Sequence, residues 1–286
     1  MTVAIVTGAT GGMGQVIAAR LAQAGMEVVT IVRDPARAGT PGTIVGDLSR
    51  RQDVLACARA ILDRYDRIHL LVNNAGAHFP GHRVSTDGVE MHIALDYLAA
   101  YGLMTLLDGP LRRGRARIVN VASDTLNDTR QIKLAGPPRP ATLDLTGVDS
   151  LAGLNPAAGF VPFEAYARAK LMTVTAGYAL ARDFAADGVT VNAVHPGIVA
   201  TGIIDDLVPA PLRPFRALIR RGLLTPAQGA EAALRIATDP ALADVTGRYF
   251  NRDRETPTPP VTHDPATQQR LLELSERHFA TGPNLP

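Results

Sequence analysis

The chain of 286 residues is short of cysteine, of long apolar runs and of net charge. Cys57 is its one cysteine, which excludes an intrachain disulfide and a cysteine-rich metal site, and we expect it to be a small buried hydrophobe on a helix. No apolar stretch reaches the roughly 18 residues that a membrane span needs, and no secretory signal is visible. A formal net charge of +2 gives no reason to expect nucleic acid or an anionic membrane as a partner. We therefore expect a cytosolic protein with no metal site and no membrane span.

What is present suits one globular domain. Hydrophobic residues make up 46% of the chain and charged residues 20%, enough to build and cover one large core. We expect residues 1–286 to form a single α/β domain. Lysine is scarce as well: only Lys133 and Lys170 occur among 29 basic residues, which suggests a specific role for a lysine that is kept.

Short apolar runs alternate with helical patterns from the N-terminus onward. We expect strands at Val3–Val6, Glu27–Val32, Thr43–Val45, Ile68–Val72, Ala116–Val121 and Val189–Val194. Their nearly continuous Val, Ile and Leu content is typical of parallel strands that are buried on both faces. Helices are expected around 13–24, 50–65, 87–107, 164–186, 227–238 and 266–279. This alternation predicts a Rossmann-type doubly wound parallel sheet with helices on both faces.

Local signals mark some helix starts and two irregular segments. The spacing of a capping box is found twice, in Ser49 with Gln52 and in Thr225 with Gln228. In the second pair, Pro226 stands at the first helical position. Residues 124–160 are rich in Pro, Gly, Asp and Leu and are expected to form a long insertion after the fifth strand. Residues 251–266 are polar and proline-rich, which predicts an irregular segment.

A glycine-rich turn joins the first predicted strand to the first predicted helix. Glycines there let the backbone turn tightly and let a pyrophosphate approach the free amides of the helix N-terminus. Gly8, Gly12 and Gly14 give the pattern TGxxxGxG, but Gly11 also permits TGxxGxxG, so the sequence leaves the choice open. We expect this turn to bind a dinucleotide through Gly8, Thr10, Gly11, Gly12, Met13 and Gly14.

Residues at later strand ends bear on the same ligand. Arg33 closes the second strand, where a guanidinium suits the 2′-phosphate of NADP(H). We therefore expect NADP(H) rather than NAD(H), although Asp34 would favour NAD if it took the ribose instead. Asp47, followed by Leu48, is placed either to bond the adenine edge or to form a turn before the next helix. The run Asn73–Gly76 suits a turn beneath the cofactor, with Asn74, Ala75 and Gly76 as predicted contacts.

Tyr166 and Lys170 are four residues apart on a predicted helix, so both project from one face. A free tyrosine has a pKa near 10 and is a poor acid–base catalyst at neutral pH. A nearby ammonium group favours the phenolate and lowers that pKa. The pair is therefore a candidate for proton transfer.

The order of these motifs resembles the short-chain dehydrogenase/reductase family, whose members carry TGxxxGxG, NNAG, a serine after the fifth strand, and YxxxK. Ser123, in the run RIVNVAS, matches the family's serine. The resemblance implies that Ser123 bonds the substrate carbonyl, that Tyr166 exchanges the proton, and that Lys170 holds the nicotinamide ribose. It also implies cofactor contacts from a loop after the sixth strand, at Pro196, Gly197, Ile198 and Thr201. His195 need not be a catalytic base.

The runs DGVEMH from Asp87 and TGRYF from Thr246 narrow the resemblance to the retinol-dehydrogenase and WW-domain-oxidoreductase branch. Two positions depart from the family pattern. Asp96 stands where relatives keep an asparagine that anchors a water in the proton relay. Ser123 also lies 43 residues before Tyr166, against roughly a dozen in most relatives, so Ser150 is a rival by distance alone.

The resemblance implies an apolar ketone, aldehyde or secondary alcohol as substrate. We expect its specificity to come from the insertion 124–160 and from residues 201–224, whose apolar content fits a lid as well as a packed helix. Relatives pair through the helix that carries Tyr166, which allows a homodimer, but the insertion could block that pairing. A nucleotide-binding regulator or scaffold with little activity is the alternative, and an epimerase-like enzyme is disfavoured because too few residues follow Thr201.

Overall fold

A computed structural model describes residues 2–34, 36, 41–130, 136–200 and 222–280. Eight strands form one sheet in the order β3-β2-β1-β4-β5-β6-β7-β8. They are β1 (Val3–Thr7), β2 (Glu27–Val32), β3 (Thr43–Val45), β4 (Leu70–Asn73), β5 (Arg117–Val121), β6 (Thr190–His195), β7 (Tyr249–Asn251) and β8 (Arg254–Glu255). All pairs are parallel except β7 with β8. The predicted doubly wound sheet is confirmed, and β7 and β8 are additions that the prediction missed.

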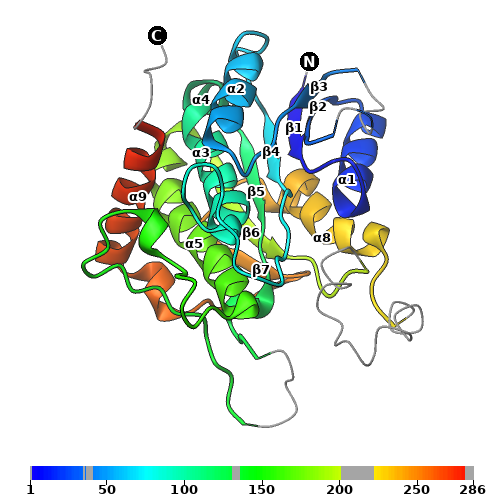
Figure 1. Cartoon of the computed structure of the whole chain (residues 1–286). Coiled ribbons are helices and arrows are strands. Elements are labelled where there is room, and N and C mark those ends of the chain that lie inside the picture. Colours follow the sequence, from blue (N-terminus) through cyan, green and yellow to red (C-terminus); the bar gives the residue numbers. More distant parts are fainter. Residues whose placement is uncertain (1, 35, 37–40, 131–135, 201–221, 281–286) are drawn as a thin grey trace.

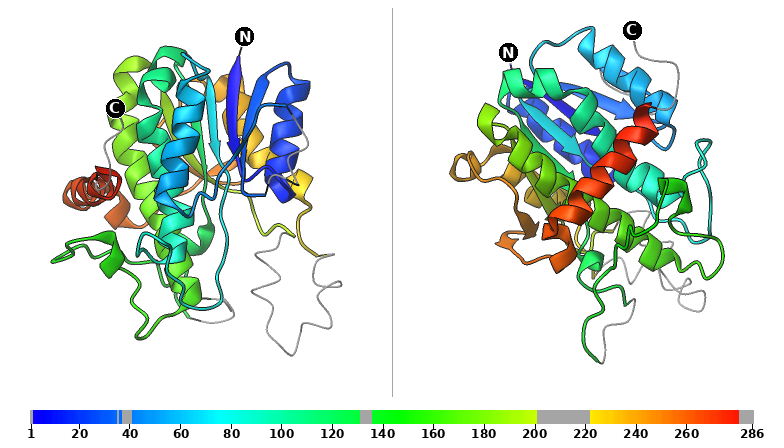
Figure 2. Two further views of the ribbon diagram at one scale, coloured as in Figure 1. Left: turned by 45° about the horizontal axis from the view of Figure 1, so that its top comes forward. Right: turned by 90° about the vertical axis from the view of Figure 1, so that its left-hand side faces the viewer.

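Helices cover both faces of this sheet (Figures 1 and 2). One face carries α1 (Gly12–Gln23) and α8 (Pro226–Thr238); the other carries α2 (Arg51–Leu62), α3 (Ala99–Leu106), α4 (Asp108–Gly114) and α5 (Pro162–Phe184). Side chains alternate between two cores along a strand. Ala4 and Val6 point into the first core, which lies between the sheet and the helices α1 and α8. Ile5 points into the second core, which lies between the sheet and the helices of the other face. Cys57 of α2 is buried in the second core, as expected. No helix in the described part of the chain is both long and apolar enough to cross a membrane.

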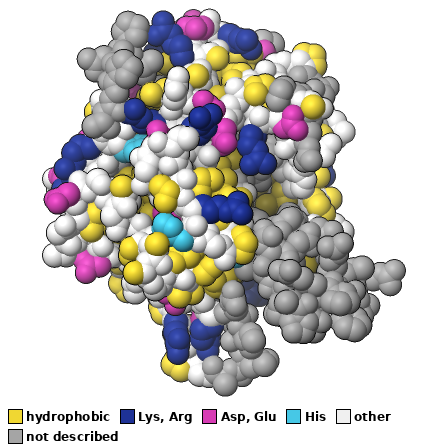
Figure 3. All heavy atoms as spheres, in the orientation of Figure 1, with side chains coloured by type: hydrophobic (Ala, Val, Ile, Leu, Met, Phe, Trp, Pro, Cys, Tyr) yellow, Lys and Arg dark blue, Asp and Glu magenta, His cyan; other side chains and the backbone are white. Residues whose placement is uncertain are grey.

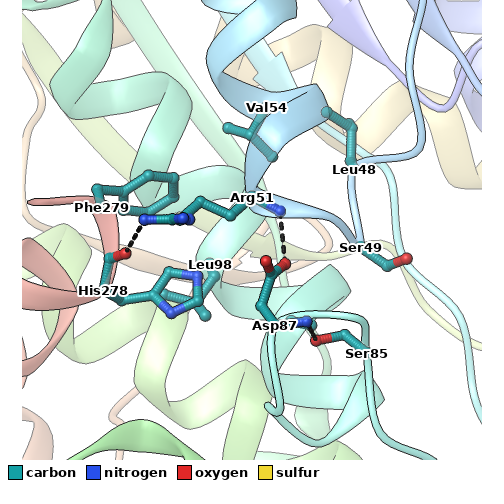
Figure 4. A pocket seen from close by; sticks show the side chains of 10 residues that line it. Leu48, Ser49, Arg51, Val54, Ser85, Asp87, Leu98, His278 and Phe279 are labelled. Carbon is teal, nitrogen blue, oxygen red and sulfur yellow. Dashed lines mark hydrogen bonds between the residues drawn. The ribbon is translucent and has the colours of Figure 1, made fainter. Parts of the chain in front are cut away.

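The start of α2 differs from the predicted capping box. The helix begins after Arg50, whose side chain makes no capping bond. The carboxylate of Asp87 instead accepts the backbone N–H of Arg51 at 2.7 Å, and Figure 4 shows the two side by side. Ser49 bonds Asp47 through its N–H and its hydroxyl. The second predicted capping box, Thr225 with Gln228, is confirmed at α8.

The predicted helix at 87–107 begins later and is wound differently. Gly88 has φ +77, and Val84 pairs with Glu90 across a tight turn, so residues 84–90 fold back on themselves. The helix that follows opens with a π-helical segment, η2 (Ile93–Leu98), and continues as α3. A π-turn leaves a backbone carbonyl displaced from the regular ladder, and here the carbonyl of Asp96 accepts the hydroxyl of Thr173 at 2.8 Å. Asp96 is thereby fixed against α5.

The insertion 124–160 is packed onto the domain where the structure describes it. Its apolar side chains Leu126, Leu143, Leu145, Leu151 and Leu154 are buried in the second core. Arg270 of the last helix, α9 (Pro265–Ala280), donates to the carbonyl of Val148. These leucines of the insertion are therefore core residues. The predicted lid at 201–224 lies outside the described residues except for its last three positions.

Helix α9 lies across the outer side of α3 and α5 (Figure 2, right). The hydroxyls of Tyr97 and Ser275 are 2.6 Å apart and both are buried. Phe279 fills the space that the missing side chain of Gly102 leaves on α3. A homodimer through α5 stays a prediction, and such a pair would have to include or displace α9.

Candidate active site

A cleft of about 660 Å³ opens at the carboxyl ends of β1, β2, β3 and β4. This is the edge at which ligands bind in open parallel sheets, because loops and helix N-termini converge there. Most of the predicted cofactor-binding residues line it: Gly8, Thr10, Gly11, Gly12, Met13, Gly14, Arg33, Asp47, Leu48, Asn74, Ala75 and Gly76. The prediction did not include the other lining residues, Ile31, Gly46, Ala77, His78, Leu95, Ala200 and Pro226.

The glycine turn shows which of its glycines the fold requires. Gly12 has φ +56, and a Cβ on Gly14 would lie 2.3 Å from the carbonyl oxygen of Gly8. Gly11 has an extended φ of 178 and open space around it, so any residue could stand there. The geometry thus selects the TGxxxGxG pattern of Gly8, Gly12 and Gly14 over the pattern that uses Gly11.

Asn74 holds the glycine turn to the end of β4. Its side-chain amide donates to the carbonyls of Thr7 at 2.9 Å and Gly8 at 3.3 Å. The hydroxyl of Thr7 accepts the backbone N–H groups of Asn74 and Ala75, each at 2.9 Å. The first N–H groups of α1 have no intrahelical partner, and no side chain of the N-cap Gly11 covers them. They face the cleft as donors for an anion.

Arg33 and Asp34 follow β2 in different settings. Arg33 lines the cleft and is exposed. Asp34 does not line it, and its carboxylate accepts the backbone N–H of Ala36 at 2.9 Å. Asp47 lines the cleft, but its Oδ1 also accepts the N–H and hydroxyl of Ser49 at 3.0 and 2.8 Å. Asp47 therefore forms the turn that the sequence offered as its alternative role.

Tyr166, Lys170 and Ser123 meet just beyond the inner end of the cleft. Tyr166 and Lys170 lie one turn apart on α5, and the ammonium nitrogen is 5.7 Å from the centre of the phenol ring. Ser123 follows β5, is buried, and lies close enough to Tyr166 for its side chain to lower the pKa of the phenol. Ser150 is exposed and precedes a short 3₁₀ turn. The structure thus brings Ser123, and not its rival, to the tyrosine.

The cleft and the reactive side chains adjoin at Gly76–His78. A Cβ on Gly76 would lie 3.0 Å from the Lys170 ammonium, so Lys170 stands directly behind the cleft wall. The ring of His78, which lines the cleft, lies edge-on to Tyr166 with ring centres 5.9 Å apart. A ligand that fills the cleft toward His78 therefore ends beside the phenol.

Lys170 forms a buried ion pair with Asp96. The distance from Nζ to Oδ1 is 3.0 Å, and Nζ also donates to the carbonyl of Val121 at 3.1 Å. Burial is the largest influence on the pKa of Lys170 and lowers it, but the charge and hydrogen bond of Asp96 together with the charge of Tyr166 outweigh burial and raise the pKa overall. Burial raises the pKa of Asp96 against the opposing effect of Lys170. Lys170 is therefore held as an ammonium, and its charge is already paired.

Burial dominates the environment of the Tyr166 phenol as well. Burial raises the pKa of Tyr166, Lys170 and the Ser123 hydrogen bond lower it, and Asp96 raises it again. The overall direction is upward. In this state the phenol is a proton donor, and an additional positive charge is needed before it loses its proton readily.

A second buried polar network lies behind Tyr166, and the sequence did not predict it. The backbone N–H of Phe79 donates to Nε2 of His92 at 2.9 Å, so the ring proton is on Nδ1, which donates to Glu90 at 2.8 Å. The other oxygen of Glu90 accepts the side-chain amide of Asn155 at 2.9 Å. The guanidinium of Arg168 on α5 in turn donates to Asn155. Glu90 and His92 stand in the run DGVEMH, where a carboxyl and an imidazole two residues apart were the available signal.

The loop after β6 is described only in part. Gly197 has φ +92, Ile198 is 60% exposed, and Val199 pairs with Leu224. Pro196, Gly197 and Ile198 do not line the cleft, whereas Ala200 does. Thr201 lies outside the described residues. His195 ends β6, and its carbonyl accepts the N–H of Arg252.

The cleft fits a nicotinamide dinucleotide. A Cβ at Gly8 or Gly14 would clash with neighbouring atoms, which marks a close packing of turn, helix and strand beneath the space for a pyrophosphate. The α1 N-terminus supplies donors, and the inner end of the cleft reaches Gly76, which backs onto Lys170. Across the described ranges, no group of three or more His, Cys, Asp or Glu side chains is arranged to hold a metal ion.

Comparison with known proteins agrees with this geometry. The family model described as short chain dehydrogenase matches residues 2–132. Retinol dehydrogenase 14 of Mus musculus is 28% identical over 297 residues, covering 95% of this chain and 84% of its own. Polyprenol dehydrogenase of Homo sapiens is 31% identical over 293 residues, covering 96% and 83%.

A solved structure carries the same fold. The 3-ketoacyl-(acyl-carrier-protein) reductase of Brucella melitensis, complexed with NADH, is 25% identical with a TM-score of 0.62. The match covers 87% of this chain and 96% of the reductase.

Proposed function

The chain belongs to the short-chain dehydrogenase/reductase family, in the retinol-dehydrogenase-like branch, and from this membership we propose that it reduces apolar ketones or aldehydes with NADPH. The family makes it an NAD(P)-dependent oxidoreductase that acts on CH–OH groups. The observation that carries the finer proposal is the meeting of Tyr166, Ser123 and Lys170 at the inner end of a cleft that fits a dinucleotide.

The chemistry assigned to the chain is proton transfer and binding. A bound nicotinamide cofactor supplies the hydride, which goes to the carbonyl carbon. Ser123 holds the carbonyl oxygen by a hydrogen bond, and the Tyr166 hydroxyl gives its proton to that oxygen as the C=O π electrons move onto it. The phenolate that remains lies beside Lys170, and a proton from solvent restores the tyrosine. Alcohol oxidation is the reverse of these steps.

The proposed preference for NADP(H) rests on Arg33. Its guanidinium lines the cleft next to the end of β2, where a 2′-phosphate would lie, and it can offer two N–H donors to one phosphate. The competing Asp34 already accepts a backbone N–H and stands outside the cleft lining. An acid that would bond the ribose of NAD is thus not presented there by the described residues.

The proposed apolar substrate is supported by exposed hydrophobic residues and by two relatives. Val84, Val161 and Ile198 are 52%, 47% and 60% exposed; Val161 directly precedes α5, which carries Tyr166 and Lys170, and Ile198 follows β6. Figure 3 shows hydrophobic side chains in the middle of one face of the molecule, with histidine and Lys or Arg side chains beside them. Two relatives are named for retinol and polyprenol, which are apolar alcohols.

Location in the cytosol stays a prediction.

An absorbance assay tests this proposal. Incubation with NADPH and a series of aliphatic aldehydes and ketones of increasing chain length should give loss of the reduced-nicotinamide band, with kcat/KM rising with chain length. A hydrophilic keto acid is the matched control and should be a poor substrate. Tyr166→Phe should lose activity by about 100-fold or more. Binding of NADPH without turnover of any carbonyl would favour the alternative, a nucleotide-binding regulator.

A further inference from the structure

Asp96 is the most deeply buried acidic group beside the reactive tyrosine. Its residue is 2% exposed and stands in the π-helical turn η2, where its carbonyl is held by Thr173. Oδ1 accepts the Lys170 ammonium at 3.0 Å and the backbone N–H of Ala77 at 3.1 Å. Oδ2 is buried and has no hydrogen-bond partner among the described residues. A carboxylate in this setting is costly, because burial penalises its charge.

Hydrogen bonding alone does not explain this carboxylate. An asparagine has the same shape, and its amide oxygen could accept from both Lys170 and Ala77 as Oδ1 does. Its amide nitrogen would bring two N–H donors to the place where Oδ2 has no partner among the described residues, so either side chain leaves hydrogen-bonding capacity unmatched there. What the aspartate adds is therefore its negative charge, placed on the Lys170 ammonium beside Tyr166.

The groups around Tyr166 show why a negative charge on Asp96 affects the ionisation of the phenol. Lys170 lies 5.7 Å from the phenol ring, and Asp96 pairs with it directly. His92 is edge-on to Tyr166, but its Nε2 accepts the Phe79 N–H, so its ring is neutral. The remaining titratable groups that face the pair or the phenol are His78, Tyr249 and, through Tyr249, Asp124. Within the described residues, Lys170 is the basic side chain other than histidine that is found beside the phenol, and its charge is paired with Asp96.

We propose that Asp96 is a positioning residue that acts as the counter-ion of Lys170 and keeps Tyr166 protonated, which adapts the site to carbonyl reduction at neutral and mildly alkaline pH. An unpaired ammonium at this distance stabilises a phenolate, whereas an ion pair exerts a much weaker field. The phenol therefore keeps the proton that reduction requires. The inference deepens the proposed function and rests on it for its consequence, but the charge relationship itself can be measured on the protein alone.

The direct test is the ionisation of Tyr166 in the free protein. Ultraviolet difference titration of each protein against its Tyr166→Phe counterpart isolates this tyrosine from the others. In the wild type, Tyr166 should ionise at a higher pH than an exposed tyrosine. In Asp96→Asn it should ionise about one pH unit lower or more, because the Lys170 charge is then unpaired. Coinciding titrations in the two proteins, or ionisation near neutral pH in the wild type, would overturn the proposal.

A matched variant controls for the loss of a negative charge as such. Asp63→Asn removes the same charge from the exposed end of α2, where the aspartate pairs with Arg59, and should leave the Tyr166 titration unchanged. An equal shift in this control would also overturn the proposal. If Asp96→Asn does not fold, Asp96→Ser, which also removes the charge, takes its place in the titration, with the same expected and contradicting results.

Kinetics then connect the charge to the reaction. For carbonyl reduction, the alkaline limb of the kcat/KM profile should fall at lower pH in Asp96→Asn than in the wild type, by about the same one unit. An alkaline limb that stays in place would contradict the adaptation to reduction. If no carbonyl is reduced, the proposed function fails, while the titration still decides whether Asp96 controls Tyr166.

Discussion

The carboxylate of Glu90 and the side-chain amide of Asn155 lie 2.9 Å apart, both buried, although 65 residues separate them in the chain. Asn155 has φ +54, and its side-chain oxygen accepts a hydrogen bond from the guanidinium of Arg168 on α5. Glu90 in turn bonds His92, whose ring lies against Tyr166. This relationship ties the insertion to the wall of the active site.

Asn155→Ala should destabilise the protein by about 1–3 kcal/mol, because it leaves the Glu90 carboxylate and the Arg168 guanidinium each short of a buried partner. Urea denaturation followed by circular dichroism measures this free energy of unfolding. Asp144→Ala is the matched control on the same insertion: its carboxylate is exposed and bonds only a local turn, so the change should stay within about 0.5 kcal/mol. Equal losses in the two variants would contradict the role of Asn155.

The Glu90 network should make stability depend on acid. Burial raises the pKa of Glu90, but the hydrogen bonds and electrostatic interaction with His92, and then the hydrogen bond from Asn155, outweigh burial and hold the pKa below its usual value. A depressed carboxyl pKa contributes stability that is present above the unfolded pKa and lost as the pH falls through the folded pKa. Between about pH 6 and about pH 3, Glu90→Gln should therefore lose less free energy of unfolding than the wild type. Parallel losses would show that Glu90 is not held in its charged form.

Gly14 and Gly11 offer a matched pair within the glycine turn. Gly14→Ala would place a methyl group 2.3 Å from the Gly8 carbonyl oxygen and 2.4 Å from the Asn74 amide nitrogen, so the turn must open. We expect a cost of about 1–3 kcal/mol in stability and a fall in NADP⁺ affinity. Gly11→Ala meets nothing within 4 Å at an extended φ, and should cost under about 1 kcal/mol. Calorimetric titration with NADP⁺ compares the two, and greater sensitivity at Gly11 would contradict the TGxxxGxG assignment.

Arg33→Ala should weaken NADP⁺ binding by about 10- to 100-fold and leave NAD⁺ binding nearly unchanged, since a guanidinium bonds a 2′-phosphate but not a 2′-hydroxyl in this way. Isothermal calorimetry with both cofactors measures the difference. Asp34→Asn is the neighbouring control and should alter neither affinity much. A preference for NAD⁺ that survives Arg33→Ala would contradict the phosphate role.

The sheet was predictable because its strands are buried on both faces and read as apolar runs. Glu27–Val32 and Thr43–Val45 were predicted at their observed bounds. β7 was missed because Tyr249–Asn251 holds none of the Val, Ile or Leu that marked the other strands, and β8 because it has only two residues, both exposed. The helix expected from Asp87 starts later, since Gly88 takes a left-handed turn that periodicity does not encode.

Site residues that belong to a motif with a fixed spacing could be predicted from the sequence. Contacts that depend on how distant segments pack could not. The glycine turn, Asn74 and the pair Tyr166 and Lys170 could be placed from local patterns. That Asp96 touches Lys170 follows from the π-turn and its bond to Thr173, which no spacing rule gives. The Glu90–Asn155 contact depends on how the insertion folds back, so the sequence alone could not reveal it.

The most direct test of hydride transfer with Tyr166 as the acid uses NADPH that carries deuterium at one or the other of the two positions on the nicotinamide C4. With an apolar aldehyde as substrate, mass spectrometry of the alcohol should show one deuterium from one of the two labelled forms and none from the other. Tyr166→Phe should form this product at least about 100-fold more slowly. An alcohol without deuterium from either form, or equal turnover by Tyr166→Phe, would contradict the account.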